Sequence, residues 1–257
     1  MYLTREDITE VLGELTKFEA DLNEVFTSRG YDFRTNTGRR NALISVAQER
    51  EVAKVLAKKY KEVIQDGAPG KPDIYIKDLD RELECKLTSG SRSKGSSVSY
   101  ALQTDWETLC NKGSLDYLYI ISNREFTGFC VLFFEGLTKD DFFPPASGSR
   151  GKSRMNKKRA MMKATCLYGD YTTQNEKNIN KILETVNKEF TDYQFKIREL
   201  WSESDSLSDI AVKSKDKMAL LRKKLTDDHQ GKVAKLSERM KYWTSTPKRY
   251  SFIFKSL

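Results

Sequence analysis

Apolar residues first recur along the chain at spacings of three and four, the period of an α-helix with one buried face. This pattern covers residues 4–28, where Thr4 can cap the start of the helix and Gly30 can end it. The same period predicts a second helix over roughly 42–60. The segment between the two helices, RTNTGRRN, is expected to be a turn-rich basic loop. Its basic residues are Arg34, Arg39 and Arg40.

From residue 74 the apolar period changes to two, the period of a β-strand. The segments DIYIK and ELECKL, joined by the turn DLDR, predict a hairpin. After the Ser/Gly-rich loop SGSRSKGSS, the segment SYALQTDWETLC predicts a helix, and DYLYIIS and GFCVLFFE predict two buried strands. Helix, strand pair, helix, strand and strand in this order predict an α/β fold, with a mixed sheet flanked by helices.

The pattern changes again after residue 136. The segment PPASGSRGKSRMNKKRAMMK holds seven basic residues between Arg150 and Lys163, and no acid occurs between Asp141 and Asp170. Residues 175–243 then show the helical period over two long stretches separated by SESDSLSD, which predicts a helical hairpin.

We therefore expect four parts along the chain. They are an N-terminal helix and basic loop (1–41), an α/β core (42–136), a basic segment (137–170), and a helical hairpin with a C-terminal strand (171–257).

Charge favours a polyanionic partner. Among 257 residues, 45 lysines and arginines outnumber 37 acids, for a net charge of +8. Nucleic acid is the first candidate and an anionic membrane surface the second. The N-terminus has no pattern of a secretory signal, and no apolar run reaches the roughly 18 residues that span a bilayer. We expect a cytoplasmic protein that does not bind membranes.

His229 is the only histidine of the sequence. A Ser-His-Asp triad, a Cys-His dyad and a multi-histidine zinc site therefore cannot be built from this chain. Hydrolytic chemistry here would depend on carboxylates, lysine and a hard metal ion.

The stretch GKPDIYIKDLDRELECK carries the candidate chemistry. Side chains alternate along a strand, so Glu84 and Lys86 project from one face and Cys85 turns into the core. Asp73, at the start of the preceding strand, can lie beside them. Two close carboxylates repel unless a positive charge lies between them, and a hard cation such as Mg²⁺ prefers oxygen ligands. We expect a site for phosphodiester hydrolysis, in which Lys86 orients or deprotonates the attacking water and stabilises charge on the phosphate. A surface hairpin with one ion pair is the plainer alternative.

The residues PD at 72–73 and ECK at 84–86 resemble the signature of the PD-(D/E)XK nucleases, with Cys85 as X. This resemblance, which covers roughly residues 42–135, implies a restriction-endonuclease-like core and makes Asp73 and Glu84 ligands of Mg²⁺. The segment AQEREVAKVL looks like the N-terminal helix of archaeal Holliday-junction resolvases and many restriction enzymes, where a glutamate completes the metal site. Glu49 is the counterpart by that pattern, and Glu51 is the alternative.

Candidate DNA contacts come from two sources. Gln103, expected on the helix after the active-site strands, resembles a position that in some relatives supports the site or touches DNA. The others are basic residues of the two predicted loops: Arg92, Lys94, Arg150, Lys152 and Arg154. A basic run of this kind can also be only solvated surface.

Together these features favour a Mg²⁺-dependent type II restriction endonuclease, which cuts both strands of DNA at a short specific sequence. The chain has no GxxxxGK[ST] motif, which fits this class better than a helicase-coupled nuclease. Cutting both strands at a palindrome calls for a homodimer, with the helical hairpin as one candidate interface, and a cognate DNA methyltransferase is expected as a separate protein. The alternatives are a structure-selective nuclease that resembles Holliday-junction resolvases, and a non-catalytic DNA-binding protein on a nuclease scaffold. A membrane-surface protein has only the net charge in its favour.

Overall fold

The computed structural model describes residues 1–66, 68, 71–90, 103–149, 151–206, 213–246 and 250–257, with side chains left undescribed at 201–206 and 213–218. The chain forms two compact units. One comprises Met1–Thr172 together with Tyr250–Leu257, and the other comprises Thr173–Arg249.

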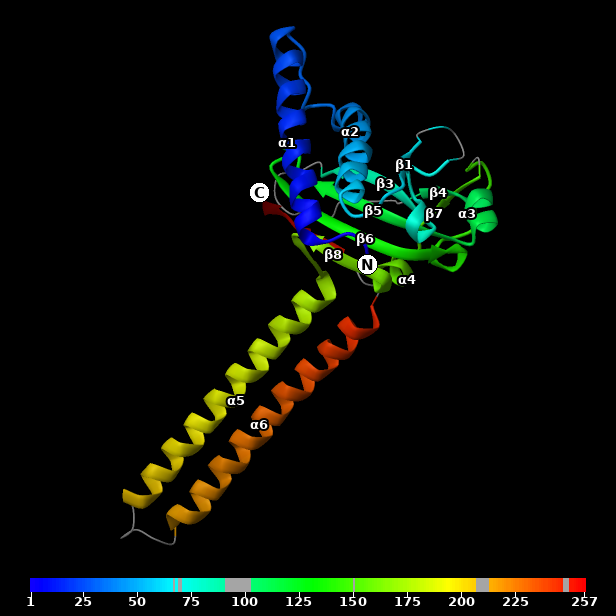
Figure 1. The fold of residues 1–257 in the computed structure, drawn as a ribbon. Helices are drawn as coiled ribbons and strands as arrows, with labels where there is room; N and C mark the ends of the chain where they lie inside the picture. Colours follow the sequence, from blue (N-terminus) through cyan, green and yellow to red (C-terminus); the bar gives the residue numbers. More distant parts are fainter. Residues whose placement is uncertain (67, 69–70, 91–102, 150, 207–212, 247–249) are drawn as a thin grey trace. The chain divides into compact units, whose positions relative to one another are not determined.

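A seven-stranded mixed sheet forms the centre of the first unit (Figure 1). Its order is β1-β2-β3-β5-β6-β11, and β8 also pairs with β6. Strands β3 and β5 run parallel, and the other paired strands of the sheet run antiparallel. The bounds are β1 Val63–Gln65, β2 Ile74–Ile76, β3 Arg81–Ser89, β5 Ser114–Ser122, β6 Gly128–Thr138, β8 Ala164–Tyr168 and β11 Lys255–Ser256. The predicted α/β architecture with a mixed sheet is confirmed.

Helices cover both faces of this sheet. On one face α1 (Arg5–Ser28) and α2 (Thr37–Ala57) pack on a core that includes Cys85 and Leu118. On the other face α3 (Trp106–Lys112), α4 (Lys157–Ala160) and the strands β4 (Gln103–Asp105) and β7 (Lys152–Arg154) cover a second core. Strand β5 is buried from Leu115 to Ser122, which explains its nearly uninterrupted apolar sequence. Three short 3-10 helices, η1 Lys77–Leu79, η2 Lys139–Asp141 and η3 Met161–Lys163, complete the unit.

Side-chain caps set where the first two helices begin. Thr4 accepts a hydrogen bond from the Asp7 amide, as predicted for α1. Helix α2 begins at Thr37 rather than near residue 42, because the Asn36 side chain accepts a hydrogen bond from the Arg39 amide. Arg39 and Arg40 therefore belong to a helix, and the predicted basic loop is wrong at these two residues.

Arg40 is fully buried rather than exposed in a loop. Its guanidinium donates to the Arg124 carbonyl and, at 2.7 Å, to the Ser89 hydroxyl at the end of β3. The equally buried Glu19 balances the charge, 3.9 Å from Arg40, and receives two hydrogen bonds from Arg34. Buried charges persist only when they are paired in this way. Two of the three basic residues thus hold α1, α2 and β3 together.

The region after the Ser/Gly-rich loop differs from its prediction. Gln103 was expected on a helix, but it lies in β4, and the helix α3 begins only at Trp106, capped by Asp105. Strand β4 pairs antiparallel with β7, which comes from the predicted basic segment. Helical periodicity could not reveal this pairing because the partner strand is distant in sequence.

The boundary expected at residue 136 also differs from the structure. Strands β8 and β11, from the segments 137–170 and 171–257, extend the central sheet at the edge of β6. Strand β6 is buried along most of its length, and the edge that does not face β5 has backbone groups that need hydrogen-bond partners. Strands β8 and β11 supply those partners. The basic segment is therefore part of the first unit.

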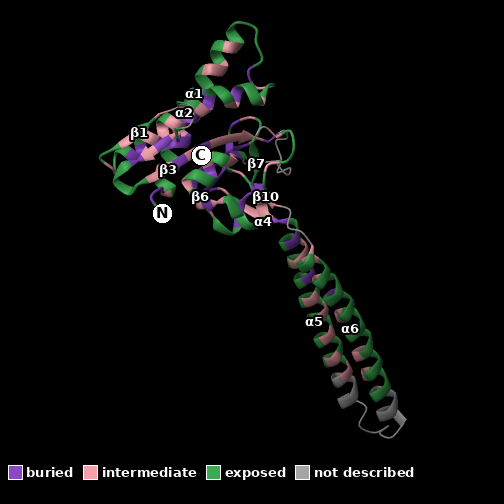
Figure 2. Ribbon diagram, turned by 90° about the vertical axis from the view of Figure 1, so that its right-hand side faces the viewer, coloured by how far each residue is buried: buried purple, intermediate pink, exposed green. Residues whose placement is uncertain are grey.

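The second unit contains the two long helices that the sequence predicts, α5 (Gln174–Ser206) and α6 (Lys213–Ser245). Stacking of Tyr193 on His229, with ring centroids 4.6 Å apart, and an ion pair between Lys232 and Glu189 link the helices. Figure 2 shows that most of their described surface is exposed. The short strands β9 (Asp170–Thr173) and β10 (Tyr250–Ile253) pair where the chain leaves and re-enters the first unit.

Gly169 provides a test of the packing at the edge of β6. Its φ is +72°, and an added Cβ would lie 2.5 Å from the Phe129 carbonyl oxygen and 2.7 Å from that of Ile253. We expect Gly169→Ala to lower the free energy of unfolding by at least about 2 kcal/mol, measured by urea denaturation. The control is Gly13→Ala in α1, where an added Cβ meets nothing within 4 Å. This substitution should raise stability by about 0.5–1 kcal/mol, and equal effects of the two substitutions would contradict the packing.

Candidate active site

The β2–β3 hairpin brings the predicted acidic residues together. Ile74 pairs with Leu83 in the antiparallel register, so Asp73 lies beside Glu84 at the next position. The Asp73 carboxylate accepts a hydrogen bond of 2.7 Å from the Cys85 amide. Cys85 is buried in the core under α1 and α2, so Glu84 and Lys86 project from the opposite face of the sheet.

Lys86 lies between the two carboxylates. Its Nζ is 3.0 Å from Glu84 Oε2 and 3.4 Å from Asp73 Oδ2. Burial alone would lower the pKa of Lys86, but the charges of Glu84 and Asp73 outweigh it and the pKa is raised. Lys86 is therefore held as a cation, which suits charge stabilisation better than proton abstraction while both carboxylates are free.

Glu49 of α2 is the fourth member of the cluster. Burial, followed by the negative charges of Asp73 and Glu84, raises the pKa of Glu49 to about 7, and Lys86 offsets part of this effect. Glu51 instead forms an ion pair of 2.6 Å with Lys54. Of the two glutamates considered from the sequence, Glu49 has a pKa that responds to the charges of the strand residues.

This set of side chains fits a hard divalent cation in its chemistry. Asp73, Glu84 and Glu49 offer oxygen ligands of the kind that Mg²⁺ prefers. Burial and the neighbouring charges of Asp73 and Glu84 together raise the pKa of Glu49, so an ionised Glu49 would be stabilised by a bound cation. In the described part of the chain, no three Asp, Glu, His or Cys side chains are already arranged around one ion position. Lys86 Nζ occupies the space between Asp73 and Glu84 instead, so metal binding would require its ammonium to shift.

Gln48 is a neighbour of the site that the sequence analysis did not single out. It is fully buried, and its Nε2 donates to the Lys86 carbonyl at 3.4 Å. Its Oε1 has no hydrogen-bond partner among the described residues. The signal in the sequence was a polar residue between Ile44 and Val52, at the i+4 position of an apolar stripe. Gln48 ties α2 to β3 and so helps to hold Glu49 near Lys86.

Three of the predicted DNA-contact residues meet on the β4–β7 ladder. Gln103 pairs with Arg154, and Asp105 pairs with Lys152. Gln103, Lys152 and Arg154 are exposed, whereas the intervening Thr104 and Ser153 are buried. Arg92, Lys94 and Arg150 lie outside the described residues.

Other basic residues of the segment are engaged within the protein. Lys163 forms an ion pair of 2.6 Å with the buried Asp141, and Arg159 donates to the Asp140 carbonyl. Burial lowers the pKa of Lys157. Fewer of these charges are available to phosphates than the sequence analysis assumed.

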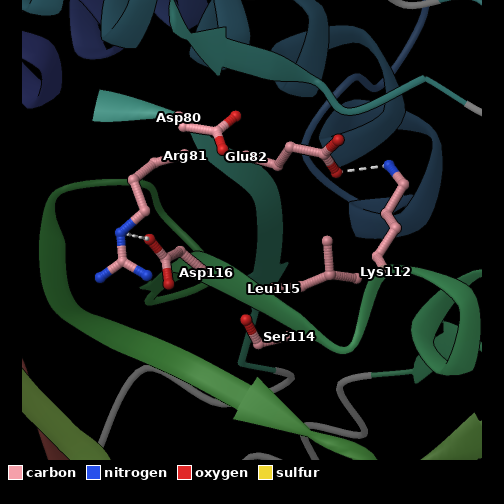
Figure 3. Close-up of a pocket in the computed structure, with 7 residues that line it drawn as sticks. All are labelled: Asp80, Arg81, Glu82, Lys112, Ser114, Leu115 and Asp116. Atoms are coloured by element: carbon pink, nitrogen blue, oxygen red, sulfur yellow. Dashed lines mark hydrogen bonds and ion pairs between the residues drawn. The ribbon is translucent and has the colours of Figure 1, made fainter. Parts of the chain in front are cut away.

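A polar pocket of about 380 Å³ lies apart from the cluster around Lys86, at the N-terminal ends of β3 and β5 (Figure 3). Its charges pair with one another: Arg81 lies 3.7 Å from Asp116, and Lys112 contacts Glu82. Asp116 also accepts hydrogen bonds from the Tyr2 hydroxyl and the Gly136 amide. This pocket contains none of the predicted site residues, and its paired charges serve to join neighbouring strands.

Comparison with known proteins gave no match to a family model, a curated protein or a solved structure. None of the helices in the described ranges is long and apolar enough to cross a lipid bilayer.

The raised pKa of Glu49 predicts a pH-dependent effect on stability. Its pKa of about 7 in the folded protein exceeds the ordinary value of 4.5, so the folded state binds the proton more tightly than the unfolded state. The resulting loss of folding stability is absent below about pH 4.5 and reaches its full size above about pH 7. We expect Glu49→Gln to raise the free energy of unfolding at pH 8 in EDTA, with the gain shrinking as the pH falls toward 4.5. Urea denaturation across this range checks it.

Glu51→Gln is the matched control, because Glu51 lies on the same helix and pairs only with the half-exposed Lys54 in the described structure. Because Glu51→Gln only removes this ion pair, it should not raise the free energy of unfolding at pH 8. A gain for Glu49→Gln that is the same at pH 4.5 and pH 8 would contradict the electrostatic origin of the shift.

Proposed function

We propose that this protein is a Mg²⁺-dependent deoxyribonuclease that hydrolyses phosphodiester bonds in double-stranded DNA, of the type II restriction class. The observation that supports it most is the placement of Lys86 between Asp73 and Glu84, with Glu49 of α2 close enough for its pKa to respond to their charges. Carboxylates that can bind a hard cation, next to an ammonium, are the groups that metal-assisted phosphodiester hydrolysis needs. The PD and ECK residues that resemble the PD-(D/E)XK signature are the same residues that meet in space.

In this proposal the carboxylates bind the metal ion and Lys86 acts on the water and the phosphate. Asp73, Glu84 and Glu49 would hold Mg²⁺, which supplies Lewis acidity toward the phosphate and activates water. Asp73 and Glu84, whose charges now raise the pKa of Lys86, would be neutralised by a bound cation. Burial, which lowers that pKa, would remain, so the pKa of Lys86 would fall. Lys86 would then lie beside the phosphate, where its ammonium can orient water and stabilise developing charge. Gln48 would position the backbone of Lys86.

The β4–β7 ladder supports DNA as the substrate. Exposed Lys152 and Arg154 offer positive charge, and Gln103 offers an amide that can read a base edge. Sequence-specific cutting of both strands also entails a homodimer with two sites and a separate protective methyltransferase. A structure-selective nuclease would use the same cluster, with recognition by DNA shape.

The test is incubation of the purified protein with unmethylated phage and plasmid DNA in Mg²⁺ and in EDTA. We expect discrete fragments that require Mg²⁺. Lys86→Ala and Asp73→Asn should each lower the cleavage rate at least about 100-fold, because each removes a group that acts on the reacting phosphate or its metal. Lys54→Ala, which removes a lysine of α2 paired with Glu51, should leave the rate unchanged.

The outcomes separate the alternatives. Cleavage of branched DNA alone would favour the structure-selective nuclease. Tight DNA binding in EDTA with no cleavage of any substrate in Mg²⁺ or Mn²⁺ would favour a non-catalytic binding protein and reject the nuclease. Cleavage that survives Lys86→Ala would reject the assignment of the site.

A further inference from the structure

An exposed aromatic ring lies next to the basic ladder. Phe142 and Met155 form a β-bridge, and the Phe143 amide donates to the Arg154 carbonyl at 2.8 Å. Phe142 and Met155 are both buried in the second core, so the alternation of side chains turns Phe143 and Arg154 to the outside. Because Arg154 also pairs with Gln103, an amide, a guanidinium and a phenyl ring form one row across three segments.

This row borders a pocket of about 490 Å³, within the range of small-ligand sites. Phe143, Pro144 and residues 146–149 line it together with Lys152 and Arg154, which contribute the charge. The Phe143 side chain is 54% exposed, unlike most phenylalanines of this unit. Among the residues that the structure describes, neither Lys152 nor Arg154 forms an ion pair within 4 Å, although the Asp105 carboxylate opposite Lys152 interacts with it electrostatically.

We propose that the Phe143 pocket binds an unstacked DNA base, whose ring stacks on Phe143 while adjacent phosphates contact Lys152 and Arg154. This rests on the proposed function, since it takes DNA as the ligand. Base stacking on an aromatic ring next to a basic groove is the usual way to hold single-stranded DNA, because every base has a flat face. A base inside a duplex is covered on both faces by its neighbours, so only a base that has left the stack can enter this pocket.

The pocket lies on a structural element that also borders the candidate active site. Thr104, on the buried face of the β4–β7 ladder, lies beside the Tyr117 hydroxyl of β5. Tyr117 is directly opposite Glu84 in the parallel β3–β5 register. The ladder therefore has its inner face toward β5, the neighbour of β3, and its outer face toward solvent. Asp105, the one acid of the ladder, caps α3 through the Thr108 amide.

The probe is a fluorescein-labelled oligonucleotide of 20 thymidines, titrated with protein in EDTA and followed by fluorescence anisotropy. We expect Phe143→Ala and Phe143→Leu each to weaken binding about tenfold, because neither side chain can stack on a base. Phe143→Trp should bind as well as the wild type or better. Phe18→Ala, which removes a partly exposed phenylalanine from α1, should bind as the wild type does. Thermal unfolding of each variant checks that it is folded.

Three results would reject base binding at the Phe143 pocket: no binding of the wild type to the oligonucleotide, unchanged affinity of Phe143→Ala, or wild-type affinity of Phe143→Leu. The last would show that Phe143 acts as an apolar contact rather than a stacking platform. The assay contains no metal and measures no cleavage, so its outcome is separate from that of the nuclease test. If binding depends on Phe143 but no DNA is cleaved, the base-binding pocket is supported and the nuclease is rejected. If DNA is cleaved but Phe143→Ala binds the oligonucleotide unchanged, the nuclease is supported and the base-binding pocket is rejected.

Discussion

The register of β3 is the constraint on which the candidate site depends. This strand lies between an antiparallel partner, β2, and a parallel partner, β5, and Cys85 is packed into the core under α1 and α2. Because side chains alternate, a shift of one residue would bury Glu84 and Lys86 and expel Cys85. The desolvation of two charges makes that arrangement unfavourable. Burial of Leu83 and Cys85 on one face of β3 thus fixes where the carboxylates and the ammonium meet.

The charges of the candidate site differ from those elsewhere in the first unit. The buried Glu19 is matched by Arg34 and Arg40, and the polar pocket at the start of β3 pairs each of its cations with an acid. Around Lys86, by contrast, two carboxylates contact one ammonium, and burial together with their charges raises the pKa of the nearby Glu49. Like charges held together in this way are a feature of sites built to bind a cation or to perform acid-base chemistry. The balanced clusters stabilise the fold, and the unbalanced one supports the proposed function.

Strand pairing determines which basic residues of the segment 137–170 are exposed. In sequence it is a run of positive charge, but in the structure β7 and β8 are strands, and Lys163 is held by Asp141. Pairing of β7 with β4 selects which residues remain free, since alternate side chains turn inward as Thr104 and Ser153 do. The same alternation places the Phe143 ring beside Arg154. An outward surface with an amide, two cations and an aromatic ring is thus a consequence of strand pairing.

The sequence by itself determined the α/β class, the β2–β3 hairpin, the two long C-terminal helices and the grouping of Asp73 with Glu84 and Lys86. These depend on periods of two and 3.6 and on residues close along the chain, which local physics fixes. Only the tertiary structure raised the pKa of Glu49, moved Gln103 from a helix to a strand, buried Arg40 and brought Phe143 to Arg154. Each of these depends on which distant segment supplies the partner. The periodicity of one segment does not identify that partner, because burial and strand pairing depend on both of the segments that come into contact.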